Sequence, residues 1–63
     1  MKVWLTPVTD DGNEKELLFE AIERIEIYPP SPMGYPRAEC GVRIKRAGLG
    51  AEWFDVVHVS VED

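Results

Sequence analysis

The chain has 63 residues, of which 44% are hydrophobic and 30% charged, and its formal net charge is −5. This composition is typical of a folded protein and not of a disordered one, and the length predicts a single small domain over residues 1–63. One cysteine excludes an internal disulfide, and one histidine excludes a zinc site of Cys and His ligands. A chain this short builds only a small core, so we expect a homodimer.

The charge is unevenly distributed. Residues 1–36 carry three basic and seven acidic side chains, residues 37–50 carry four and one, and residues 51–63 carry four acidic side chains only. The acidic total disfavours non-specific binding to nucleic acid, which depends on basic side chains that meet phosphates. No uncharged stretch is long enough to span a membrane, and the first residues lack the apolar core of a signal peptide, so we expect a cytoplasmic protein.

Residues 2–9 predict a strand, because most of them are β-branched or aromatic. Pro7 cannot donate to a ladder of hydrogen bonds, so this strand either lies at an edge of the sheet or carries a bulge. Residues 10–13, with the sequence Asp-Asp-Gly-Asn, predict a turn, since Gly and Asn tolerate positive φ angles.

Residues 14–28 allow two interpretations. A helix over 14–25 is indicated by Asn13 followed by Glu16, which is the spacing of a capping box. Two strands are indicated by apolar alternation and by the β-propensity of residues 25–28, which run into two prolines. The balance favours two strands separated by a tight kink, and we expect the break at Glu23, where alternation fails.

The last third of the chain predicts a hairpin. Residues 38–47 alternate between apolar and charged side chains, residues 48–50 supply two glycines for the turn, and residues 51–61 form a long strand. We expect this strand to be central, because both of its faces carry apolar residues. Strict alternation gives it one face with Trp53, Asp55, Val57, Val59 and Val61, and another with Phe54, Val56, His58 and Ser60. The predicted fold is mainly β: a small antiparallel sheet of four or five strands, either an open barrel or packed in a dimer, with an α+β alternative if residues 14–25 are helical.

The most distinctive segment is the proline loop, residues 28–36, which holds four of the five prolines, both tyrosines and one methionine. Proline-rich segments favour polyproline II and lose little entropy on binding, and Tyr and Met are enriched at interfaces. The alternative is a crossover strapped over the sheet with Tyr35 packed inward. The predicted partner contacts are Tyr28, Pro30, Pro32, Met33, Tyr35 and Arg37.

Arg43 and Lys45 share one face of their predicted strand, and they are the candidate anion site, with Arg37 and Arg46 nearby. The alternative is pairing with acidic residues across the sheet. The two glycines of residues 48–50 lack the third glycine and the following helix of a nucleotide fingerprint.

No catalytic or metal-binding set can be assembled. Alternation places Asp55 and His58 on opposite faces, and Cys40 alternates with apolar residues as a small core side chain does. A string of five glutamates indicates either a solvated face or, less well, a mimic of nucleic-acid phosphates: Glu14, Glu16, Glu20, Glu23 and Glu26. We therefore expect no enzyme and no cofactor.

The functional hypothesis is a protein-binding module, an inhibitor or adaptor that occludes a larger partner. In its length and its lack of catalytic groups, the chain resembles small adaptor and inhibitor proteins, many of which are encoded by phages and mobile elements. The alternatives are a protein that sequesters a small anion or nucleotide, and a structural component of a larger assembly.

Overall fold

The computed structural model describes residues 1–63 and contains five β-strands and no helix. The strands are β1 (Lys2–Pro7), β2 (Leu17–Phe19), β3 (Ile22–Tyr28), β4 (Cys40–Arg46) and β5 (Ala51–Glu62). They form one open antiparallel sheet in the order β2-β1-β5-β4-β3. The mainly β prediction is confirmed. The helical alternative for residues 14–25 is wrong, because β2 and β3 occupy that segment and pair with β1 and β4.

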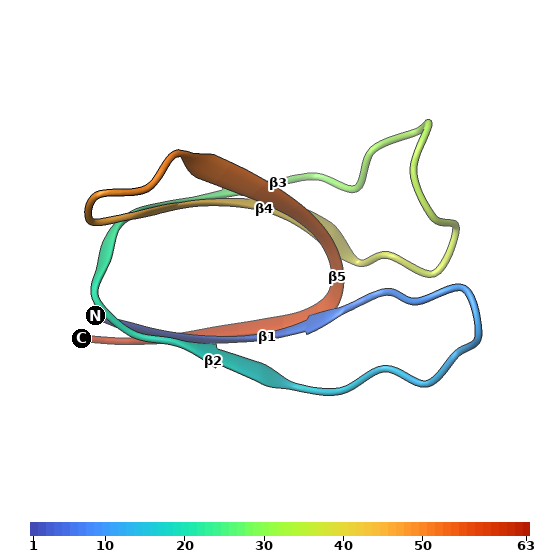
Figure 1. Ribbon diagram of the computed structural model, residues 1–63. Helices are drawn as coiled ribbons and strands as arrows, with labels where there is room; N and C mark the ends of the chain where they lie inside the picture. The colour runs from blue at the N-terminus through green and yellow to red at the C-terminus, as the bar shows by residue number, and fades with distance from the viewer.

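The long strand β5 lets the sheet curl around its own core. Its first half, from Ala51 to Val56, pairs with β4, and its second half, from Val56 to Glu62, pairs with β1. In Figure 1, β3, β4 and the start of β5 lie above, β1, β2 and the end of β5 lie below, and β5 bends between the two layers. The predicted central place of this strand is confirmed.

Pro7 lies at a register shift between β1 and β5. Thr6 pairs with His58 and Pro7 pairs with Val56, so Val57 has no partner on β1. The bulge interpretation of Pro7 is confirmed and the edge interpretation is wrong, because β1 lies between β2 and β5. A proline is tolerated here because a bulge interrupts the ladder of hydrogen bonds.

The same bulge reverses the alternation of β5. Val56, before the bulge, is fully buried, and Val59, after it, also packs against the core. The predictions that Val59 shares a face with Trp53 and that Asp55 and His58 lie on opposite faces are therefore wrong. One extra residue in a strand turns every later side chain to the other face.

The break between β2 and β3 falls at Glu20 and Ala21, two residues before the predicted position. Ala21 adopts a left-handed conformation with φ of 55°, which turns the chain from the lower to the upper layer. The failure of alternation at Glu23 reflects a register shift between Ile22 and Arg24 inside β3. The sequence signal was real, but it marked a bulge and not a strand end.

The core lies between the two layers and is small. Nine of the 63 residues are buried. The central cluster consists of Val3, Leu5, Ile22, Val42, Ile44 and Val56. Each fully buried aliphatic side chain contributes about 1.5–3 kcal/mol, so this cluster dominates the folding free energy. The predicted hairpin turn is confirmed: Gly48 has a positive φ of 77°, and the Leu49 amide donates to the Arg46 carbonyl at 3.1 Å.

Candidate protein-binding surface

The outer face of β3, β4 and the first half of β5 carries aromatic and charged side chains together. Val42 and Ile44 of β4 are buried, so the residues that alternate with them point outward. The strand register aligns three rows across this face: Tyr28–Gly41–Asp55, Glu26–Arg43–Trp53 and Arg24–Lys45–Ala51.

Two aromatic rings form a shelf on this face. The Trp53 ring lies over Gly41, where a side chain would overlap the ring carbons Cζ2 and Cη2. The Tyr28 ring packs against Trp53 with centroids 5.6 Å apart and planes tilted by 37°. The Trp53 indole donates to Asp55 Oδ1 at 3.1 Å. We call Tyr28 and Trp53 the aromatic shelf; both rings remain partly exposed, at 39% and 47%.

The proline loop leaves its large apolar residues in solvent. Met33 is 93% exposed and Tyr35 is 41% exposed. Pro30 and Pro32 are also exposed. The Gly34 amide donates to the Ser31 carbonyl at 3.1 Å, which folds the tip of the loop into a turn. The inward packing of Tyr35 that a strap over the sheet requires is not seen.

Asp55 joins the proline loop to the aromatic shelf. A Cβ at Gly34 would lie 3.2 Å from Asp55 Oδ2, so the loop approaches this carboxylate closely. The negative charge of Asp10, and to a smaller extent that of Asp55, raises the pKa of the Tyr35 phenol. Asp55 therefore links the proline loop to the aromatic shelf, and acidic groups lie near Tyr35.

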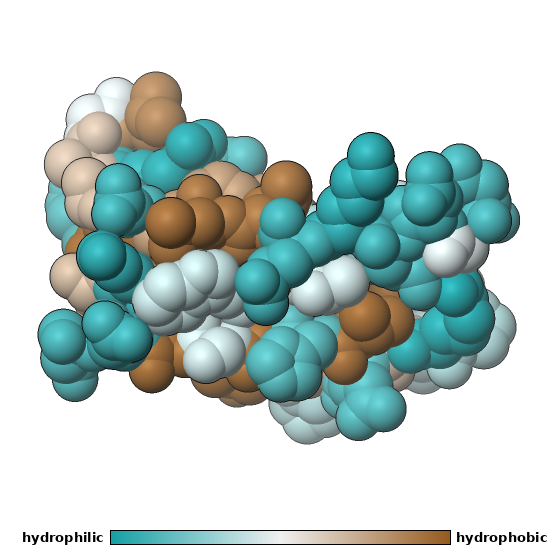
Figure 2. Space-filling model, turned by 90° about the horizontal axis from the view of Figure 1, so that it is seen from below, coloured by the Kyte–Doolittle hydropathy of each residue, from teal (hydrophilic) through white to brown (hydrophobic).

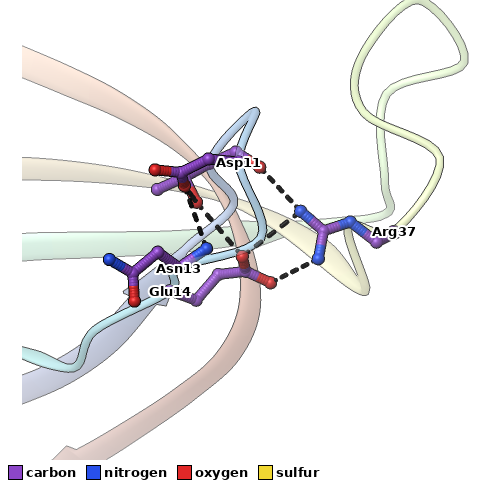
Figure 3. Close-up of polar contacts among 5 residues, drawn as sticks. Asp11, Asn13, Glu14 and Arg37 are labelled. Atoms are coloured by element: carbon purple, nitrogen blue, oxygen red, sulfur yellow. Dashed lines mark hydrogen bonds and ion pairs between the residues drawn. The ribbon is translucent and has the colours of Figure 1, made fainter.

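Arg37 holds the base of the proline loop against the β1–β2 loop (Figure 3). Its guanidinium donates to both carboxylate oxygens of Glu14, at 2.7 and 3.2 Å, and to the Thr9 carbonyl at 2.6 Å. On the β1–β2 loop, the backbone N–H of Asn13 donates to Asp11 Oδ1 at 2.9 Å, and this bond lowers the pKa of the Asp11 carboxyl. Arg37, a predicted partner contact, thus already binds within the chain and positions the loop.

The predicted anion-binding residues line a hollow on the same outer face. The hollow has a volume of about 150 Å³. Its lining residues are Arg24, Glu26, Arg43, Lys45 and Ala51. Glu26 lies 2.9 Å from Arg24 and 3.6 Å from Arg43, and Glu23 lies 3.7 Å from Lys45. The structure therefore brings Arg43 and Lys45 together, and it also pairs each with a glutamate, as the cross-strand alternative predicts.

The remaining basic residue of this segment faces inward. Arg46 pairs with Glu52, and its guanidinium carbon lies 5.3 Å from the centroid of the Phe19 ring. Phe19 in turn packs against Phe54 with centroids 5.6 Å apart. Arg46 thus covers one end of the core and does not belong to the hollow. Arg46 Nε is buried without a hydrogen-bond partner.

The other chemistry-bearing residues do not form a reactive set. The His58 side chain makes no hydrogen bond or ion pair. Cys40 is half-buried against the core, and this burial raises the pKa of its thiol. A raised pKa leaves less of the reactive thiolate at neutral pH.

The glutamate string does not form a continuous acidic strip. Glu20 lies 3.8 Å from Lys2, and Glu14, Glu23 and Glu26 pair with basic residues as described above. Glu16 alone of the five has no ion pair. These pairs leave little uncompensated charge, which favours the solvated-face interpretation over phosphate mimicry.

Trp53 and Asp55 are central to the surface, yet neither is among the partner contacts predicted from the sequence. The available signal was a glycine in an otherwise alternating strand, since such a glycine often marks close approach of another group. Only the register shows that Trp53 is the group that covers Gly41.

The opposite outer face, over β1 and β2, is also partly apolar (Figure 2). Trp4 pairs with Leu18 across these strands, on the side away from the buried Val3 and Leu5. Leu18 is 49% exposed. The proline loop and the Asp55 carboxylate, which border the aromatic shelf, do not lie on this face.

Comparison of the chain with models of protein families, with curated protein sequences and with solved structures finds no match. The structure also contains no helix of the length and apolarity needed to cross a membrane.

Proposed function

We propose that this protein acts without catalysis, by binding another protein through the aromatic shelf and the proline loop. In this role it is an inhibitor or adaptor that occludes part of a larger partner in the cytoplasm. The observation that carries the proposal is the link that Asp55 makes between the exposed side chains of the loop and those of the sheet. Gly34, which lies between the exposed Met33 and Tyr35, approaches Asp55 closely, and the same carboxylate accepts a hydrogen bond from the Trp53 indole. Exposed aromatic and methionine side chains gathered on one surface are typical of interface hot spots.

The side chains on this surface indicate which side chains the partner presents to it. The apolar centre fits an apolar side chain of the partner, and the prepacked rings of Tyr28 and Trp53 lose little conformational freedom on binding. The carboxylates of Asp10 and Asp55 border this centre and favour Lys or Arg on the partner beside that apolar side chain. We therefore expect association to slow as salt is added, because charge attraction steers the encounter.

The test compares variants of the surface with a matched control. The tagged protein captures its partner from the native cell, and the purified pair is then titrated by calorimetry. Met33→Asp and Trp53→Ala should each weaken binding about 30-fold or more, as truncation of a hot spot does. Leu49→Ala is the control, because Leu49 is 52% exposed but lies on the hairpin between β4 and β5. Unchanged affinity in both folded surface variants would reject the proposal.

A second candidate function is supported by the hollow that Arg43 and Lys45 line. An anion of the size of phosphate, or the phosphates of a nucleotide, would displace Glu26 and Glu23 from these cations. Thermal-shift measurements with inorganic phosphate and with nucleoside phosphates test this function. A rise in Tm that Arg43→Gln abolishes supports sequestration of an anion, whereas no shift at millimolar ligand removes it.

The small core also leads us to propose a homodimer. Nine buried residues supply little stabilisation against the entropy of ordering 63 residues, and a second copy would bury further surface.

A further inference from the structure

The outer edge of β3 has no partner within the chain. β3 pairs with β4 only, and it ends the strand order on that side of the sheet. The six backbone hydrogen bonds outside the strand ladders involve no residue of β3. Its seven residues also make it longer than β2, the three-residue strand at the other end of the order. An edge strand of this length presents a row of free N–H and C=O groups that can receive another strand.

We propose that this edge receives β3 of a second copy, antiparallel, in the register centred on Ile25. Arg24 and Glu26 flank Ile25 and share the outer face of the sheet. In this register, Arg24 of each copy lies opposite Glu26 of the partner subunit, so the two-fold axis creates two attractive pairs. Centring the pair on Arg24 or on Glu26 would instead oppose two like charges, which destabilises a sheet. The charge sequence of β3 is therefore complementary to itself in one register.

The charges involved already form part of a network. Within the chain, Glu26 lies 2.9 Å from Arg24 and 3.6 Å from Arg43, and Arg24 is the most exposed member, with 71% of its side chain in solvent. Pairing of two copies would extend this network across the new seam. Several linked charges hold one geometry better than an isolated surface pair does.

The inner side of the same edge supplies apolar surface. Ile25 is half-buried against the core, and Ile27 is 54% exposed although it pairs with the fully buried Val42. Ile27 thus sits on the core side of the sheet at its open margin. A second β3 would cover this margin, and each added Å² of buried apolar surface stabilises the assembly by about 25 cal/mol.

The geometry also limits assembly to two copies. A two-fold pair uses the same edge on both chains, so neither copy offers β3 to a third. The bulge at Glu23 interrupts regular pairing beyond Arg24 and keeps the joined segment short. The proposal does not depend on the proposed partner-binding function. Tyr28 of the aromatic shelf belongs to β3, but its ring packs on Trp53 on the outer face, whereas the strand pairing uses backbone groups at the edge.

Sedimentation equilibrium of the whole chain tests the proposal. The wild type should reach twice its 7.2 kDa mass as its concentration rises. Arg24→Glu alone and Glu26→Arg alone should each raise the dimer dissociation constant about tenfold or more, because each places two like-charged pairs across the seam. Circular dichroism establishes that each variant keeps its strands.

An equimolar mixture of these two single variants provides the decisive measurement. In the mixed pair every cross-strand contact is again between opposite charges, so heterodimers should form where neither variant pairs with itself. The double variant Arg24→Glu/Glu26→Arg should likewise restore a homodimer. Amide exchange should show that the β3 amides directed away from β4 are protected at high concentration and exposed at low concentration. A wild type that stays monomeric would overturn the proposal, and so would two folded variants that fail to pair when mixed.

Discussion

Gly41→Ala tests whether the Trp53 ring is held against the sheet. The φ of Gly41 is not positive, so its backbone accepts alanine, and the only obstacle is the ring above it. A methyl group there would force the ring outward. The ring would lose its packing on Tyr28, worth about 0.5–1.5 kcal/mol, and its hydrogen bond to Asp55, worth a similar amount.

The expected cost follows from these two losses. Loss of the ring packing and of the hydrogen bond lowers the free energy of unfolding by about 1–3 kcal/mol. Replacing glycine by alanine raises it by about 0.4–1 kcal/mol, because alanine restricts the unfolded chain. The net destabilisation therefore lies between about 0 and about 2.6 kcal/mol and is centred on about 1.3 kcal/mol. For a domain of this size, each kcal/mol corresponds to a fall in Tm of about 4–8 °C. Urea unfolding followed by circular dichroism, with tryptophan fluorescence to monitor the ring, measures both effects.

Two controls isolate the mechanism. Gly50→Ala introduces the same methyl group where no heavy atom lies within 4 Å and φ is not positive, so its stability should stay equal to wild type or rise slightly. In a Trp53→Ala background the obstacle is absent, and Gly41→Ala should then cost nothing. Equal destabilisation by Gly41→Ala with and without the Trp53 ring would refute this account of the shelf.

Three further predictions concern the bend and the two long loops. Ala21→Gly should stabilise the protein by about 0.5–1 kcal/mol in urea unfolding, because glycine accepts a φ of 55° without strain; a loss of stability would show that the bend is not strained. A double-mutant cycle of Arg37→Ala and Glu14→Gln should yield a coupling of about 0.5–1 kcal/mol, and additive effects would mean that their ion pair does not hold the loops together. The charge of Asp10 raises the pKa of Tyr35 above its unfolded value of 10.0, so the stability that this phenol contributes is present below that pH and is lost as the pH rises through the folded pKa. Tyr35→Phe should remove this alkaline loss from the unfolding profile, and an unchanged profile would assign the loss to other groups.

The sequence by itself determined most of the architecture. The alternation around Val42 and Ile44 predicted β4 and its wet face, and the glycines of residues 48–50 predicted the hairpin to β5. These patterns are readable because a half-buried strand must alternate and a tight turn needs residues that accept positive φ. The same local signals exposed Pro7 and Glu23 as irregular positions.

The tertiary structure decided what those irregular positions mean. Local pattern cannot separate a strand end from a bulge, and it cannot show that one unpaired residue, Val57, turns the later half of β5 over. Local pattern also could not distinguish Trp53 from the other aromatic residues. The Trp53 ring lies over Gly41 only because β4 and β5 pair in this register. Propensity and alternation act between near neighbours along the chain, whereas the shelf and the free edge of β3 arise from pairing between distant segments.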